Sequence, residues 1–111
     1  MKVESLGRPA HFFIPAHKWH NFPNGKYVSD RVHDFLMANY GGYTLRGPFK
    51  GNWRPQQGAY PIVESVMEIK VAFEGKERIP ELQKFLADLC ALINEECLYL
   101  ETGEDSFLIY P

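Results

Sequence analysis

An alternation of apolar and polar side chains over residues 63–73 constrains the fold of this chain more than any other feature of the sequence. Most odd positions of this stretch are apolar: Val63, Met67, Ile69, Val71 and Phe73. Several even positions are charged: Glu64, Glu68 and Lys70. A period of two sends successive side chains to opposite faces of a β-strand, so we predict a strand with one buried face and one face in water. Because eleven residues is long for a strand, we also expect a bend near residues 65–66.

Two other stretches carry apolar residues at helical spacing. The first follows Ser29, an expected N-cap, and ends at the Gly41-Gly42 pair. Its apolar face is formed by Val32, Phe35, Leu36 and Tyr40. The second begins at Pro80, and its stripe comprises Leu82, Phe85, Leu86, Leu89 and Ile93. Since each helix has a single apolar stripe, both are expected to pack on the same face of a sheet.

Short apolar runs supply the remaining strands, at residues 11–14, 43–46 with 51–54, 97–100 and 107–110. The stretches 16–27 and 55–61 are rich in polar, Pro and Gly residues and are expected to be loops. The resulting order is β-α-β-β-α-β with a possible extra C-terminal strand. We therefore predict an α+β, ferredoxin-like sandwich, with an antiparallel sheet and two helices on one face. With 111 residues, the chain is expected to form one domain over residues 1–111.

Composition excludes several classes of protein. Hydrophobic residues make up 45% and charged residues 23%, which is typical of a globular protein and not of a disordered one. No apolar run approaches the roughly 20 residues of a membrane-spanning helix, and the start lacks a signal-peptide pattern, so we expect a cytoplasmic protein. Residues 1–60 carry eight Lys/Arg and three acidic residues, whereas residues 61–111 carry four and eleven. We expect the two halves to complement each other within one fold or across a homodimer.

Residues that could carry metal, thiol or phosphate chemistry lack the required pattern. His17 and His20 form an H-x-x-H in a segment expected to be a loop, with no accompanying carboxylate ligand set, so no metal is expected. Cys90 and Cys97 are seven residues apart, which fits neither a disulfide within one helix nor a C-x-x-C motif. No phosphate loop or dinucleotide fingerprint is present, and we expect no cofactor.

Residues 43–60 form the most informative segment for function. They contain three basic residues, no acidic residue, and the aromatic residues Tyr43, Phe49, Trp53 and Tyr60. We predict that Tyr43, Trp53, Arg54 and, on the following strand, Glu64 form a ligand-binding surface. Glu64 lies near Arg54 across the expected hairpin, where an ion pair is the simpler interpretation. Basic residues among aromatic ones also suit nucleic acid, but the RNA-recognition signature is absent from the following strand, so this hypothesis is the weakest.

These residues carry a resemblance to a known family. A known pattern is matched by Phe35-Leu36, Gly41-Gly42-Tyr43-Thr44, Gly51-Asn52-Trp53-Arg54, Gly58 and Glu64. These residues resemble the pattern of an uncharacterised family of small bacterial ferredoxin-like proteins. The similarity extends to Glu96-Cys97-Leu98-Tyr99, where an acidic residue precedes an apolar strand. The resemblance implies the ferredoxin-like fold and no particular activity.

Two function classes follow from these observations. The leading hypothesis is a non-enzymatic binding or interaction module with Trp53 as an anchor. The alternative is a small dimeric α+β-barrel enzyme that acts on an organic small molecule, with Arg54, Glu64 and His33 orienting substrate or moving protons. The sequence leaves open whether the protein is an enzyme. An enclosed cavity with convergent polar groups would favour the enzyme, and an exposed patch would favour the interaction module.

Overall fold

The structure is a computed structural model that describes residues 1–54 and 60–111. Its strands are β1 (Arg8–Pro15), β2 (Thr44–Trp53), β3 (Ile62–Phe73), β4 (Leu98–Glu101) and β5 (Ser106–Ile109). Its helices are α1 (Ala16–Trp19), α2 (Val28–Tyr40) and α3 (Ile79–Leu92), with short 3-10 turns at Pro23–Gly25 and Lys76–Arg78. Within the described residues, no helix is long and apolar enough to cross a membrane.

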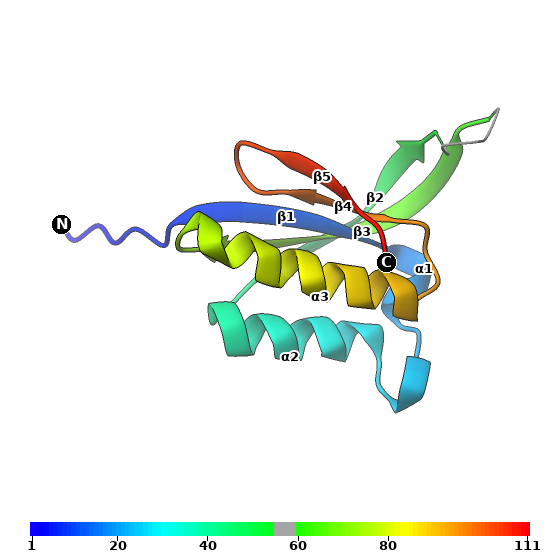
Figure 1. The fold of residues 1–111 in the computed structure, drawn as a ribbon, viewed down its shortest axis with the longest axis horizontal. Coiled ribbons are helices and arrows are strands. Elements are labelled where there is room, and N and C mark those ends of the chain that lie inside the picture. Colours follow the sequence, from blue (N-terminus) through cyan, green and yellow to red (C-terminus); the bar gives the residue numbers. More distant parts are fainter. Residues whose placement is uncertain (55–59) are drawn as a thin grey trace.

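The five strands form one antiparallel sheet in the order β2-β3-β1-β4-β5 (Figure 1). The predicted α+β class and the order of elements are confirmed, and β5 is the extra C-terminal strand. The first strand, β1, lies at the centre of the sheet between β3 and β4.

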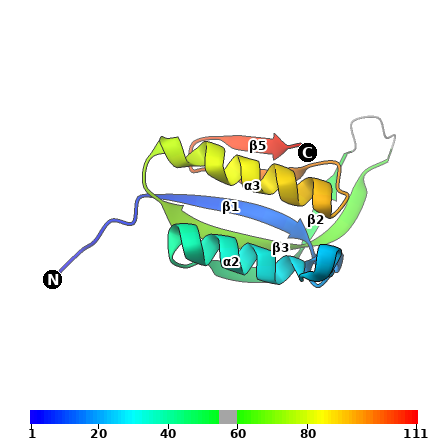
Figure 2. The ribbon, with the colours of Figure 1, turned by 60° about the horizontal axis from the view of Figure 1, so that its bottom comes forward.

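Both long helices cover the same face of the sheet, as predicted (Figure 2). The core lies between them and the sheet, where Phe12 of β1, Leu36 of α2 and Leu86 of α3 are all fully buried. The helices also contact each other through Phe35 and Phe85, whose rings stack with centroids 3.9 Å apart. The opposite side of the sheet, called the helix-free face below, has neither α2 nor α3 packed on it.

Strand β3 follows the predicted alternation only over its second half. Ile69, Val71 and Phe73 are buried in the core, but Val63 is 59% exposed, so its predicted burial is wrong. The reason is that the β2–β3 hairpin extends beyond α2 and α3, so neither long helix covers this part of the strand (Figure 1). Glu68, expected in water, is instead only 8% exposed. The predicted interruption at Gly47-Pro48 is a register shift between Arg46 and Phe49 within one continuous strand.

Two local predictions between β1 and α2 are wrong. Residues 16–19 form the short helix α1 and not a loop, because Trp19 packs into the core with 5% exposure. Ser29 does not cap α2, which begins at Val28 without a side-chain cap. Val28 is fully buried, so core packing determines where the helix starts. Gly41 ends α2 in the left-handed conformation with φ 77°, as the glycine pair predicts.

Candidate functional site

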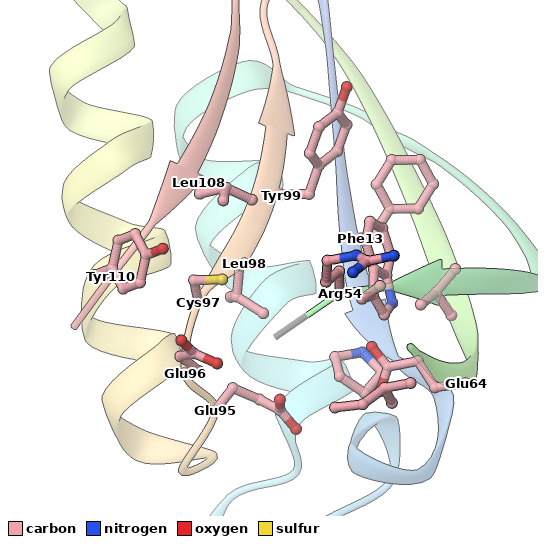
Figure 3. Close-up of a pocket in the computed structure, with 14 residues that line it drawn as sticks. Phe13, Arg54, Glu64, Glu95, Glu96, Cys97, Leu98, Tyr99, Leu108 and Tyr110 are labelled. Atoms are coloured by element: carbon pink, nitrogen blue, oxygen red, sulfur yellow. The ribbon is translucent and has the colours of Figure 1, made fainter. Parts of the chain in front are cut away.

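A pocket of about 180 Å³ opens on the helix-free face of the sheet. Figure 3 shows the pocket at the end of the sheet where β1 ends and β4 begins, beside β2 and β3. Strand residues form one side, and the segment between α3 and β4 forms the other. The lining combines aromatic and aliphatic side chains with four charged residues, which are Arg54, Glu64, Glu95 and Glu96.

Four aromatic residues line the pocket, and Phe13, Tyr99 and Trp53 form a connected group. The ring of Tyr99 lies 5.6 Å from that of Phe13 and 6.3 Å from that of Trp53, measured between centroids. The indole of Trp53 folds back over its own strand, since a Cβ built at Gly51 would lie 2.9 Å from the ring. Gly51 therefore leaves the space that the ring occupies. The indole Nε1 is buried and makes no hydrogen bond to any described residue.

Carboxylates outnumber cations in the pocket lining, three to one. Burial raises the pKa of Glu64 above its ordinary value, and the negative charge of Glu95 raises it further. The nearby indole N–H of Trp53 opposes this shift without reaching hydrogen-bond geometry, and His17 and Lys18 oppose it through their charge. Lys18 of α1 also lies 3.5 Å from the Glu95 carboxylate and connects α1 to the segment that precedes β4. Carboxylates therefore predominate among the charged groups of the pocket lining.

The structure brings together three of the four predicted ligand-binding residues. Trp53, Arg54 and Glu64 all line the pocket. Tyr43 does not, because it precedes β2 at the far end of that strand and its hydroxyl lies 2.9 Å from Nδ1 of His33. His33, proposed for the enzyme alternative, is thus also outside the pocket. No ion pair joins Arg54 to Glu64 among the residues that the structure describes.

The sequence reasoning missed the opposite wall of the pocket, formed by Phe13, Tyr99, Glu95 and Glu96. One signal was available, since the acidic residue before the apolar strand at 97–100 formed part of the family resemblance. The pairing of that strand with β1 places it beside the pocket, and a local pattern does not reveal such a pairing.

The two cysteines are free thiols, one buried and one half-buried. Burial is the main cause that raises the pKa of Cys90 to about 11, and it also raises the pKa of Cys97, which lines the pocket. Both are poor nucleophiles, since the thiolate is the reactive form. Residues 1–54 and 60–111 contain no group of three side chains that could hold a metal ion.

The segment 43–60, which could bind nucleic acid, is described only in part. Residues 55–59 lie outside the described residues, and they include Gly58 of the family resemblance. Arg46, one of its three basic residues, is paired with Glu68. Arg54, another, lies among the carboxylates of the pocket. The nucleic-acid hypothesis stays a prediction.

No protein-family model matches the chain, and no curated protein gives a significant sequence match. Two solved structures are similar to it. One is a phage SAM lyase in complex with S-methyl-5'-thioadenosine, with a TM-score of 0.63 and 15% sequence identity. The other is a phage SAM lyase in its apo state, with a TM-score of 0.57 and 16% identity. Each similarity covers 100% of this chain and 95% of the other, and supports the fold.

Proposed function

We propose that the protein is a small enzyme that binds S-adenosylmethionine (SAM) and cleaves a carbon–sulfur bond of this sulfonium compound. The observation that carries the proposal is the pocket on the helix-free face, where three carboxylates converge with a connected group of three of its four aromatic rings. The ligand named for one structural neighbour, S-methyl-5'-thioadenosine, is the thioether that remains after such a cleavage. This proposal favours the enzyme alternative over the interaction module.

Each part of the pocket matches a part of this substrate. Aromatic rings such as Trp53 and Tyr99 offer flat apolar surfaces on which a nucleobase stacks, and they attract cations through their faces. The carboxylates of Glu64, Glu95 and Glu96 attract the sulfonium and the ammonium group. The cavity of about 180 Å³ is smaller than the roughly 300–1,000 Å³ of complete ligand sites, so the described residues enclose only part of the ligand.

The proposed cleavage breaks the bond between sulfur and the four-carbon amino acid arm. The electron pair of that bond moves to sulfur, which becomes a neutral thioether. The arm forms a new bond within itself, and no co-reactant is required. Either its carboxylate oxygen bonds to the carbon that leaves sulfur, or the next carbon loses a proton to a carboxylate of the pocket lining and a carbon–carbon double bond forms. The apolar side chains of the lining favour the step, because they solvate the neutral thioether better than the charged sulfonium.

The experiment is an incubation of the purified protein with SAM, followed by chromatographic detection of S-methyl-5'-thioadenosine. Glu64→Gln should reduce kcat/KM about tenfold or more, since a charged partner of the ligand is lost. Glu104→Gln serves as the matched control, because Glu104 is exposed and lies in the turn between β4 and β5, outside the pocket. Binding without turnover would support the interaction module instead. If wild-type protein neither binds nor cleaves SAM, the proposal is refuted.

The predicted homodimer remains part of this proposal. It is tested by native mass spectrometry, in which a dimer that retains bound nucleoside would support both the assembly and the pocket.

A further inference from the structure

Arg46 is an exposed arginine whose guanidinium is held in place from two sides. Its Nη2 donates a hydrogen bond of 2.7 Å to Oε1 of Glu68, and its Cζ lies 5.7 Å from the centre of the Phe49 ring. Nδ1 of His11 lies 3.3 Å from the same Glu68 oxygen. The side chain of Arg46 is nevertheless 58% exposed, whereas that of Glu68 is 11% exposed. A buried carboxylate thus orients a cation at the surface.

The strand register places this guanidinium next to the pocket. Glu68 pairs with Phe13 across β3 and β1, and Phe49 pairs with Val66 across β2 and β3. Directly opposed residues in antiparallel strands project from the same face of the sheet. Since Phe13 and Val66 both line the pocket, the two groups that hold Arg46 adjoin its wall on the helix-free face.

The proposed substrate carries a carboxylate and needs a cationic group to bind it, whereas the charged residues of the pocket lining are mainly anionic. Its amino acid arm ends in a carboxylate, whereas three of the four charged lining residues are carboxylates themselves. Arg54 is the cation in the lining, but no hydrogen bond or ion pair to a described residue fixes its guanidinium. A guanidinium has five N–H donors, and in the described part of the chain Arg46 uses only the Nη2 group, toward Glu68. Because Glu68 and Phe49 already hold the Arg46 guanidinium in place, less conformational entropy is lost when a ligand binds to it.

We propose that Arg46 binds the carboxylate of the substrate's amino acid arm, with Glu68 and Phe49 as positioning residues. This inference rests on the proposed function. Four bonds separate the sulfur from the carboxyl carbon, a reach of about 5 Å. Neighbouring strands are about 4.8 Å apart, so the arm can extend by one strand from the pocket wall toward Arg46. An extended arm holds its carboxylate away from the carbon bonded to sulfur, so this inference goes with the double-bond route of the cleavage.

The test compares two adenosyl thioethers that the cleavage does not consume. S-adenosylhomocysteine keeps the amino acid arm, and S-methyl-5'-thioadenosine lacks it. Isothermal titration calorimetry gives the affinity of wild-type protein and of each variant for both ligands. Arg46→Gln should weaken binding of S-adenosylhomocysteine about tenfold or more, and should change binding of S-methyl-5'-thioadenosine less than about twofold. Glu68→Gln should produce the same selectivity with a smaller loss, since it only frees the guanidinium.

Three results would overturn the inference. Equal losses for both ligands would show that Arg46 maintains the fold of this face, and unchanged affinities would show that it does not contact the ligand. A selective loss in Arg54→Gln instead would assign the carboxylate to Arg54. Because Arg46→Gln leaves Glu68 without its cation, Arg46→Lys is the second variant. It keeps the charge but not the fork geometry, and an intermediate selective loss is expected. Wild-type protein is titrated first, and failure to bind either ligand would refute the proposed function itself.

Discussion

Replacement of Gly51 by alanine should change ligand binding through a neighbouring side chain while leaving the backbone undisturbed. A Cβ at position 51 would lie 2.9 Å from one atom and 3.0 Å from two further atoms of the Trp53 side chain, whereas ordinary contacts begin at 3.4 Å. The indole must therefore retreat by about half an ångström. It cannot keep both its position over strand β2 and its place in the pocket lining.

The size of the effect follows from this displacement. Stacking of a base on an aromatic side chain contributes about 1–3 kcal/mol, and a gap of half an ångström removes about a quarter of a contact energy. The loss is then about 0.3–0.8 kcal/mol, or roughly 1.5- to 4-fold in affinity. Gly51→Val places more atoms against the ring and should displace it fully, with a loss of about 5-fold or more.

The assay is calorimetric titration with S-methyl-5'-thioadenosine, with circular dichroism to monitor the fold. Gly42→Ala is the matched control, because a Cβ at position 42 meets nothing within 4 Å. In both alanine variants the unfolded chain loses freedom, which stabilises the native state by about 0.4–1 kcal/mol where the backbone is compatible. Affinity that is unchanged in both Gly51 variants would refute the placement of the Trp53 ring in the binding site.

Three further predictions concern stability. Burial raises the pKa of Glu64, so ionisation of this carboxyl opposes folding as pH rises above the ordinary carboxyl range. Glu64→Gln should therefore raise Tm at pH 8 more than at pH 4, as measured by scanning calorimetry. The hydrogen bond from Arg46 is the main cause that lowers the pKa of Glu68, so its contribution to stability is present at neutral pH and disappears as pH falls through the lowered pKa. Glu68→Gln should accordingly lower Tm at pH 7, and the loss should shrink as pH falls. A loss independent of pH would contradict this. Leu86→Ala should lower the free energy of unfolding by about 2–5 kcal/mol in urea denaturation, since the side chain of Leu86 is fully buried in the core. A smaller loss would argue against close packing there.

Sequence periodicity was sufficient to predict the class of the fold, because the helices and strands each bury one regular stripe. Leu36, Leu86 and Ile69 were assigned to the core by spacing alone, and all three are fully buried. Spacing failed where burial depends on a distant partner. Glu68 was expected in water because its face of β3 carries charged residues, yet Arg46 and His11 cover it.

The candidate site could be predicted only on the side that is local in sequence. Trp53, Arg54 and Glu64 belong to one hairpin, so their proximity follows from strand pairing between neighbours. Glu95 and Tyr99 reach the same pocket because β4 pairs with the central strand β1. Tyr43 belongs to the same hairpin but lies at its other end, about ten residues from Trp53 along an extended strand. A distance of roughly 30 Å separates such positions.

The central position of β1 has a consequence for biosynthesis. Among the five strands, β1 is synthesised first, yet its partners β3 and β4 begin at Ile62 and Leu98. The nascent chain therefore carries an apolar strand with both edges unpaired until most of the domain has been translated. Unpaired edges invite association with other chains, and pairing over long separations is slow. A ribosome stalled before Leu98 would present one open edge of β1, so association with other chains during translation is expected first at this strand.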